Sequence, residues 1–325
     1  MSKAEFGKGE QMFQSQVNRR VTTGMMLVIL GTVCFAAKAI FIKLAYEKGA
    51  SPEATLFARQ LIATPLFWIL FLINRPKIPA IRQRGDSVKA CFAGLLSFFL
   101  SPLLDFIGLH HVSAIVERML LISYPVFVMI LSAFMQKRMI SIQNLIAIVV
   151  IYAGIYLSIG GWNTGLLKAN LTGAIFILLS SVVYAGYLVL SSQLVHKIGG
   201  IRMNAYGMAS ASLAMVVYLV IKSVSGNSMN LFRYSLSVYE LYFVIAVVST
   251  VVSFVLILEG IKRIGAERAS ILSMLGPVIT ILLGTLFLGE RLELVQWAGC
   301  FLVFLTVAVL ELQKFRGRMY KKSND

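Results

Sequence analysis

The chain has 325 residues, of which 58% are hydrophobic and only 14% are charged. Soluble domains contain about 45–50% apolar and about 25% charged residues, so this composition excludes a soluble enzyme, a coiled coil and a disordered chain. The formal net charge is +16, which in a soluble protein would suggest a nucleic-acid partner. Cytoplasmic loops of membrane proteins are rich in lysine and arginine, which explains the surplus without nucleic acid.

Ten apolar runs follow a polar, basic segment at the start of the chain. A helix needs about 20 mostly apolar residues to cross a bilayer. The runs lack the alternation of a barrel strand, so the sequence predicts an all-α integral membrane protein with ten transmembrane helices. The predicted helices span residues 22–46, 52–73, 88–109, 112–135, 142–159, 171–193, 203–224, 239–260, 266–289 and 292–312.

The basic residues between these runs predict the orientation. With both termini inside, 21 of the 30 lysines and arginines face the cytoplasm and five face the outside, and the rest lie within helices. Positive charge marks cytoplasmic loops. We therefore expect a multi-pass protein of the bacterial inner (plasma) membrane, embedded in the lipid bilayer, with both termini in the cytoplasm.

The chain also repeats itself. Residues 108–156 align without gaps onto residues 260–308, an offset of 152, and a looser match at offset 149 places Gly24 on Gly173. Each half holds five helices, an odd number, so the second half enters the membrane from the opposite side, as in many secondary transporters. The predicted units are a cytoplasmic segment (1–21), a first five-helix repeat (22–159), an external linker (160–170), a second, inverted repeat (171–312) and a basic cytoplasmic tail (313–325).

A motif near the end of the second repeat carries a family resemblance. The run 265–272, followed by Gly276-Pro277-Val278 and by Leu288-Gly289-Glu290, resembles the ninth-helix signature of the drug/metabolite transporter superfamily, EamA type. Tyr124-Pro125-Val126 and Gln136-Lys137-Arg138 form a degenerate copy in the first repeat. The resemblance covers nearly the whole chain. It implies a transporter of a small-molecule substrate, with export of amino acids or related metabolites as the expected activity.

Ionisable side chains at membrane depth are costly unless they are paired or hydrated, so they are the best functional candidates. We expect them to line a hydrated vestibule whose net positive charge favours a substrate with a carboxylate or another anionic group. Lys43 and Arg59 lie close enough to the membrane surface to reach water on their long stems instead. The outer half of the first repeat gathers four cations and two acids, namely Lys38, Lys43, Arg59, Arg118, Asp105 and Glu117.

Neighbours along a helix point about 100° apart, so Glu117 and Arg118 are expected to find partners on other helices. Lys38 or Arg59 is the expected partner of Glu117, and Asp105 the expected partner of Arg118.

A second charged set lies near the inner face of the second repeat. At the repeat offset of 152, Asp105 matches a position two residues from Glu259, and Glu117 matches one two residues from Glu267, which Arg268 follows. The pattern predicts two gates, one at each membrane face. The alternative is that Glu259, Glu267 and Arg268 are ordinary interface residues of a basic loop.

Two prolines and a tyrosine complete the candidate site. Pro125 and Pro277 occupy equivalent places in the two repeats, where they are either hinges or fixed kinks that shape a cavity. Tyr184 is a candidate for the cavity wall, although aromatic side chains at helical spacing more often pack in a core.

The sequence contains no zinc-protease motif, nucleophile elbow or phosphate loop, so we expect neither an enzyme nor a cofactor or metal site. Without a nucleotide-binding motif, the energy would come from the substrate gradient or from protons as the coupling ion. A drug or organic-cation effluxer is the alternative within the class, although interior cations would repel a cation. An intramembrane enzyme is the alternative from another class.

Overall fold

The computed structural model describes residues 3–77, 84–135, 137, 139, 141–226 and 231–324, and within these ranges it holds helices and no strand. Eight helical segments are long and apolar enough to cross a membrane, and two shorter apolar helices cover 142–158 and 294–310. Together they account for the ten predicted crossings. The prediction of an all-α, ten-helix membrane protein is confirmed.

In the first repeat, three of the five crossings are interrupted. The first crossing is broken at Ala37, the third passes through a π-helical segment, and the fourth is broken at Ile122 and Ser123. The elements are α1 (Lys3–Ala36), α2 (Lys38–Glu47), α3 (Pro52–Asn74), a short 3-10 turn (Arg75–Lys77), α4 (Arg84–Gly94), the π-helix η2 (Leu95–Leu100), α5 (Ser101–His111), α6 (Ala114–Leu121), α7 (Tyr124–Met135) and α8 (Ile142–Ser158).

In the second repeat, the first crossing is one continuous helix that begins at Thr164, within the segment 160–170 expected as a linker. The side chain of Asn163 caps this helix by accepting a hydrogen bond from the Leu166 N–H at 3.3 Å. The elements are α9 (Thr164–Ile198), α10 (Gly200–Val224), α11 (Leu236–Ala246), the π-helix η3 (Val247–Val252), α12 (Ser253–Ile264), α13 (Ala266–Ser273), α14 (Gly276–Leu288) and α15 (Leu294–Asn324).

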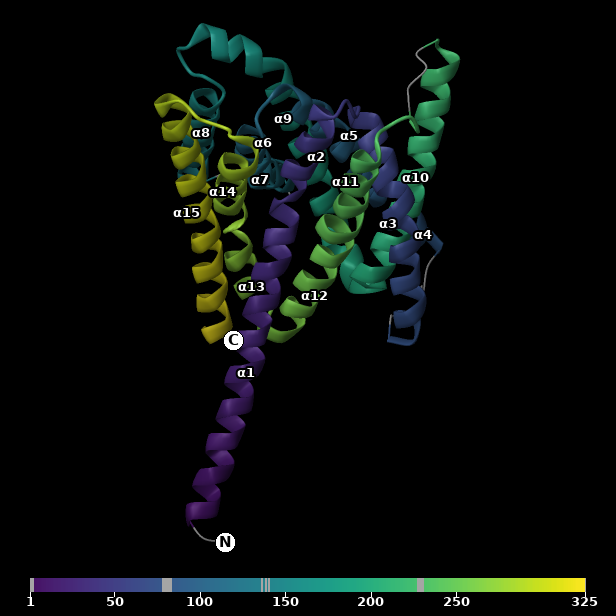
Figure 1. Ribbon diagram of the computed structural model, residues 1–325. Helices are drawn as coiled ribbons and strands as arrows, with labels where there is room; N and C mark the ends of the chain where they lie inside the picture. The colour runs from purple at the N-terminus through teal and green to yellow at the C-terminus, as the bar shows by residue number, and fades with distance from the viewer. Residues whose placement is uncertain are drawn as a thin grey trace.

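The irregular segments recur in register between the repeats. Both bounds of η3 lie 152 residues after those of η2, and α13 lies 152 residues after α6. Both chain termini lie at one end of the bundle, which we call the terminal end, and the opposite end is the distal end (Figure 1). Helix α6 lies distal to α7, whereas α13 lies on the terminal side of α14 (Figure 1). The two broken crossings are therefore related by an inverted arrangement.

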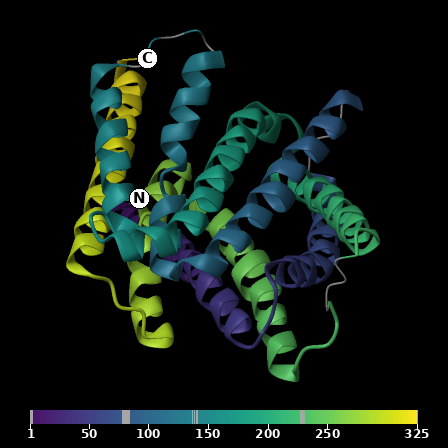
Figure 2. The same cartoon turned by 90° about the horizontal axis from the view of Figure 1, so that it is seen from above.

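Close helix crossings also recur in pairs. Helix α1 packs on α12 where Gly24 meets Gly260, and α5 packs on α9 where Gly108 meets Gly173. A Cβ atom on Gly108 would lie 2.9 Å from the Gly173 carbonyl oxygen, so only glycine allows this approach. Helices α8 and α15 lie side by side at one edge of the bundle (Figure 2). These contacts leave room between the repeats for a cavity.

The crossing of α4 and α10 gives a stability test. A Cβ atom on Gly94 would lie 1.9 Å from the Gly207 Cα, so Gly94→Ala must push two backbones apart. Overpacking of this kind costs about 1–3 kcal/mol. We expect a lower thermal unfolding midpoint for Gly94→Ala in detergent. The matched control is Gly85→Ala in the same helix, where the added Cβ meets nothing within 4 Å; equal midpoints would contradict the packing.

Candidate functional site

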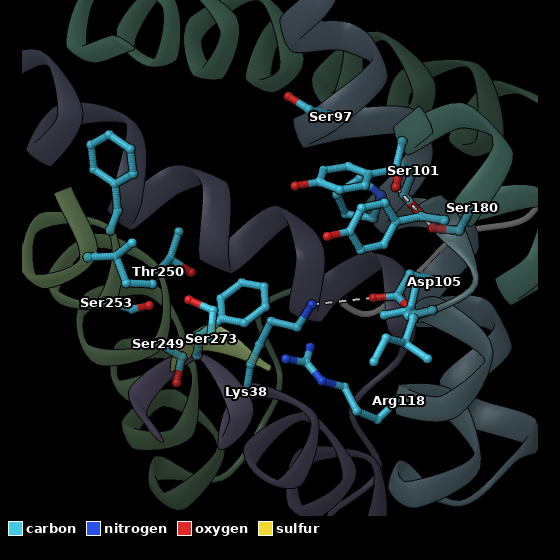
Figure 3. Close-up of a pocket in the computed structure, with 18 of the residues that line it drawn as sticks. Lys38, Ser97, Ser101, Asp105, Arg118, Ser180, Ser249, Thr250, Ser253 and Ser273 are labelled. Atoms are coloured by element: carbon cyan, nitrogen blue, oxygen red, sulfur yellow. Dashed lines mark hydrogen bonds and ion pairs between the residues drawn. The ribbon is translucent and has the colours of Figure 1, made fainter. Parts of the chain in front are cut away.

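A cavity of about 560 Å³ lies between the two repeats. Its walls come from both repeats, so residues far apart in the sequence meet around one space (Figure 3). Seven of the residues singled out from the sequence line it, namely Lys38, Arg59, Asp105, Arg118, Pro125, Tyr184 and Pro277.

Lys38 and Asp105 form an ion pair across the cavity wall. The break at Ala37 makes Lys38 the first residue of α2, and its Nζ lies 3.4 Å from Oδ2 of Asp105 on α5 (Figure 3). Both side chains are buried. The other carboxylate oxygen, Oδ1 of Asp105, has no hydrogen-bond partner among the described residues. Asp105 therefore pairs with Lys38 and not, as expected, with Arg118.

Arg59 is the least satisfied cation of the site. It is 5% exposed, and its guanidinium lies over the ring of Phe106 at 5.3 Å. Its Nε and Nη2 atoms are buried and find no hydrogen-bond partner in the described part of the chain. A buried guanidinium with open donors is costly to keep unless a ligand or water completes it.

Arg118 also reaches into the cavity without an ion pair to any described residue. Its guanidinium stacks on the ring of Phe35 at 5.2 Å and lies against Gly276. A Cβ atom on residue 276 would come within 2.5 Å of the arginine Nη2. The glycine of the Gly-Pro motif in the second repeat therefore leaves room for an arginine of the first.

Glu117 lies behind the cavity wall. It is 1% exposed, and its Oε2 has no hydrogen-bond donor among the described residues. The charged side chains with the strongest electrostatic interaction with Glu117 are those of Asp105, Lys38 and Arg118. The site thus holds three cations and two carboxyls.

Aromatic rings form another part of the wall. Tyr184 lies edge-on to Tyr124 with ring centroids 5.4 Å apart and contacts Tyr187 at 5.5 Å. Pro125 and Pro277 lie in the first turn of α7 and α14, directly after the two helix breaks. Proline is tolerated in a first turn because the N–H there has no intrahelical acceptor. Whether the prolines act as hinges stays a prediction.

Sequence reasoning missed the hydroxyl groups of the cavity. Ser101 and Ser180 hydrogen-bond to each other at 2.9 Å, and Ser253 donates to the Gly31 carbonyl at 2.9 Å. Serines in apolar runs resemble packing residues. The repeat register held the signal, since the two cavity serines Ser97 and Ser101 lie 152 residues before Ser249 and Ser253, which also line the cavity.

Two charged residues of the second repeat, Glu259 and Arg268, lie away from the cavity. Glu259 pairs with Lys262 at 2.5 Å on the same helix, with both side chains exposed, and Arg268 is exposed. Neither Glu259 nor Arg268 lines the cavity, and the side chain of Glu267 lies outside the described residues. The paired-gate hypothesis stays a prediction.

A further residue joins the repeats at the distal end. The carboxylate of Glu290, which follows α14, accepts hydrogen bonds from the backbone N–H groups of Ala114 at 2.6 Å and Ile115 at 3.1 Å. These are open donors at the start of α6, where a carboxylate also opposes the helix dipole. Glu290 therefore fixes the end of the helix that carries Glu117 and Arg118. It belongs to the Leu-Gly-Glu motif, but its partners are not visible in the sequence.

Glu290→Ala would remove this cap and leave two N–H groups without an acceptor. Loss of a helix cap costs about 0.5–2 kcal/mol, so we expect a lower thermal unfolding midpoint. The control is Glu240→Ala, which removes an exposed carboxylate from α11. If both variants unfold at the wild-type temperature, Glu290 does not stabilise α6.

Comparison with known proteins agrees with this architecture. The sequence matches the EamA-like transporter family over residues 22–160 and again over 171–312. It is 56% identical over 303 residues to Uncharacterized transporter YcbK of Bacillus subtilis, covering 93% of this chain and 97% of that protein. It is 22% identical over 295 residues to Uncharacterized inner membrane transporter YicL of Salmonella typhimurium, covering 90% of this chain and 96% of that one.

Among solved structures that share the fold is a crystal structure with a TM-score of 0.56 and 13% sequence identity, which covers 90% of this chain and 97% of its own. The broken inverted crossings and the central cavity define a transporter of the ten-helix type. The chain belongs to the EamA-like transporter family.

Proposed function

We propose that the protein is a secondary transporter that moves a small polar metabolite with a carboxylate or other anionic group, such as an amino acid, by alternating access. The observation that carries the substrate class is the buried guanidinium of Arg59 beside the cavity, whose Nε and Nη2 donors meet no acceptor among the described residues. A planar guanidinium matches a carboxylate in geometry and charge. Arg118 offers a second guanidinium without an ion pair in the described residues.

The balance of charge favours an anion over a cation. Lys38, Arg59 and Arg118 line the cavity, and Asp105 is the one carboxylate among the described residues of its wall. Even with Glu117 ionised behind the wall, the site keeps a net positive charge. Like charges repel strongly where water is scarce, which argues against an organic-cation effluxer.

Alternating access is supported by the inverted repeat. The helix breaks after α6 and α13 lie at equivalent places in units of opposite orientation and border the same cavity. Secondary transporters of this kind bind substrate near the bilayer midplane and rock one unit against the other. We further propose an inner-membrane location with cytoplasmic termini, from the basic loops, and net export, which the family resemblance implies.

Substitution of Arg59 tests the substrate class. A thermal-shift screen of the purified protein against a metabolite panel first identifies a compound that stabilises it. A hydrogen bond to a charged group contributes about 1.5–3 kcal/mol, so Arg59→Gln should weaken binding of an anionic hit by about tenfold or more. Without ligand the variant should unfold at or above the wild-type temperature, because it no longer buries a guanidinium whose donors lack acceptors.

The matched control for this test is Arg233→Gln, which removes an exposed arginine outside the cavity. It should bind the hit as wild type does. If Arg59→Gln binds the hit with wild-type affinity, or if only compounds without an anionic group stabilise the protein, the proposed substrate class is wrong.

Cysteine labelling in intact cells tests the orientation. In a background without Cys34, Cys91 and Cys300, an impermeant maleimide should label Trp162→Cys, since Trp162 is 79% exposed at the distal end. It should not label Lys197→Cys, an exposed position at the terminal end of α9, until the cells are opened. The reverse pattern would place the termini outside and overturn the proposed orientation.

A further inference from the structure

Two carboxyl groups of the site face one another without a donor between them. Asp105 on α5 and Glu117 on α6 are 3% and 1% exposed, and their side chains lie within hydrogen-bonding reach of each other. Oδ1 of Asp105 and Oε2 of Glu117 both lack a partner among the described residues. Two buried carboxylates within hydrogen-bonding reach repel each other unless one of them carries a proton.

The charged groups around the pair are engaged elsewhere or act from a distance. On α2, Lys38 contacts the other oxygen of Asp105, and the Tyr46 hydroxyl donates to the Phe106 carbonyl at 3.0 Å. On α3, Arg59 stacks on Phe106, and on α6, Arg118 stacks on Phe35. Lys43 on α2 is attracted electrostatically by Glu290 and Glu47, and less strongly by Glu117. None of these groups donates to the two open oxygens.

We propose that Asp105 and Glu117 form a proton-binding site, in which one proton is shared between Oδ1 of Asp105 and Oε2 of Glu117. The proton comes from water and returns to water, so the site needs no other reactant. One shared proton satisfies both open oxygens and leaves the pair with a single negative charge, which Lys38 balances. The coupling ion of the transporter would then be the proton, a role that rests on the proposed function.

Coupling follows from the position of Lys38, which serves both the carboxyl pair and the cavity. An anionic group that enters the cavity competes with Asp105 for the Lys38 ammonium. A carboxyl pair that loses its cation holds its proton more tightly, whereas a pair that keeps the cation gives the proton up more easily. Occupancy of the cavity and occupancy of the proton site therefore favour each other through Lys38, so proton and substrate would move in the same direction and net export would follow an outward substrate gradient.

Infrared spectroscopy of the full-length protein in lipid tests the proton site without any substrate. At about pH 7 exposed carboxyls, with pKa values near 4, are ionised, so a C=O stretch of a protonated carboxyl reports a shielded group. We expect such a band in the wild type, with a shift in D2O. Glu117→Gln should lose it, because the glutamine amide replaces the shared proton as donor to Asp105. The control Glu240→Gln, which alters an exposed carboxyl on α11, should keep it.

Thermal unfolding against pH provides the second measurement. The wild-type midpoint should fall as the pH rises and the shared proton leaves, whereas the Glu117→Gln midpoint should not show that loss, since its donor does not titrate. A wild-type spectrum without the band, or a band that Glu117→Gln leaves unchanged, would overturn the proton site. Neither result depends on substrate, so the Arg59→Gln binding test would stand or fall separately.

Discussion

A charge held at membrane depth must be paired, stacked or hydrated, and this constraint shapes the site. An isolated charge there costs several kcal/mol or more by most estimates. Lys38 meets the constraint by pairing with Asp105 at 3.4 Å, and Arg118 by stacking on Phe35. Arg59 meets it only in part, over the Phe106 ring with two open donors. A guanidinium of this kind beside a cavity is stabilised only when water or a ligand enters and accepts hydrogen bonds from its open donors.

The inverted repeat provides the frame that makes this cluster useful. Breaks and π-helical segments recur at an offset of 152 and bring irregular backbone and serine hydroxyls to the same space from opposite directions. The charges, in contrast, are not repeated, since among the described residues the four charged ones that line the cavity belong to the first repeat. The second repeat contributes complementary features, such as Gly276 beneath Arg118 and Glu290 at the start of α6. In the described part of the chain, the first repeat thus supplies the charged groups of the cavity, and the second supplies hydroxyl groups and contacts that hold the charged segment in place.

Much of the fold could be predicted from the sequence, because hydrophobic runs and repeat offsets are properties of the chain alone. The cost of buried charge also singled out Lys38, Arg59, Asp105 and Arg118, all of which line the cavity. The pairing could not be predicted, because it depends on the break at Ala37 and on how α5 and α6 are turned. Contacts between repeats, such as Glu290 with the Ala114 N–H, join residues 176 positions apart and leave no local signal. Glu259, which was expected at an inner gate, instead pairs with Lys262 on its own helix and does not line the cavity.

The central claim is that the cavity cations recognise an anionic group, and a comparison of charged and neutral ligands tests it most directly. The measurement is the equilibrium affinity of a carboxylate hit and of its methyl ester, each for the wild type and for Arg59→Gln. The account predicts that the wild type binds the acid about tenfold or more tightly than the ester, and that Arg59→Gln narrows this preference markedly. Equal affinities of acid and ester in the wild type, or a preference that Arg59→Gln leaves unchanged, would contradict it.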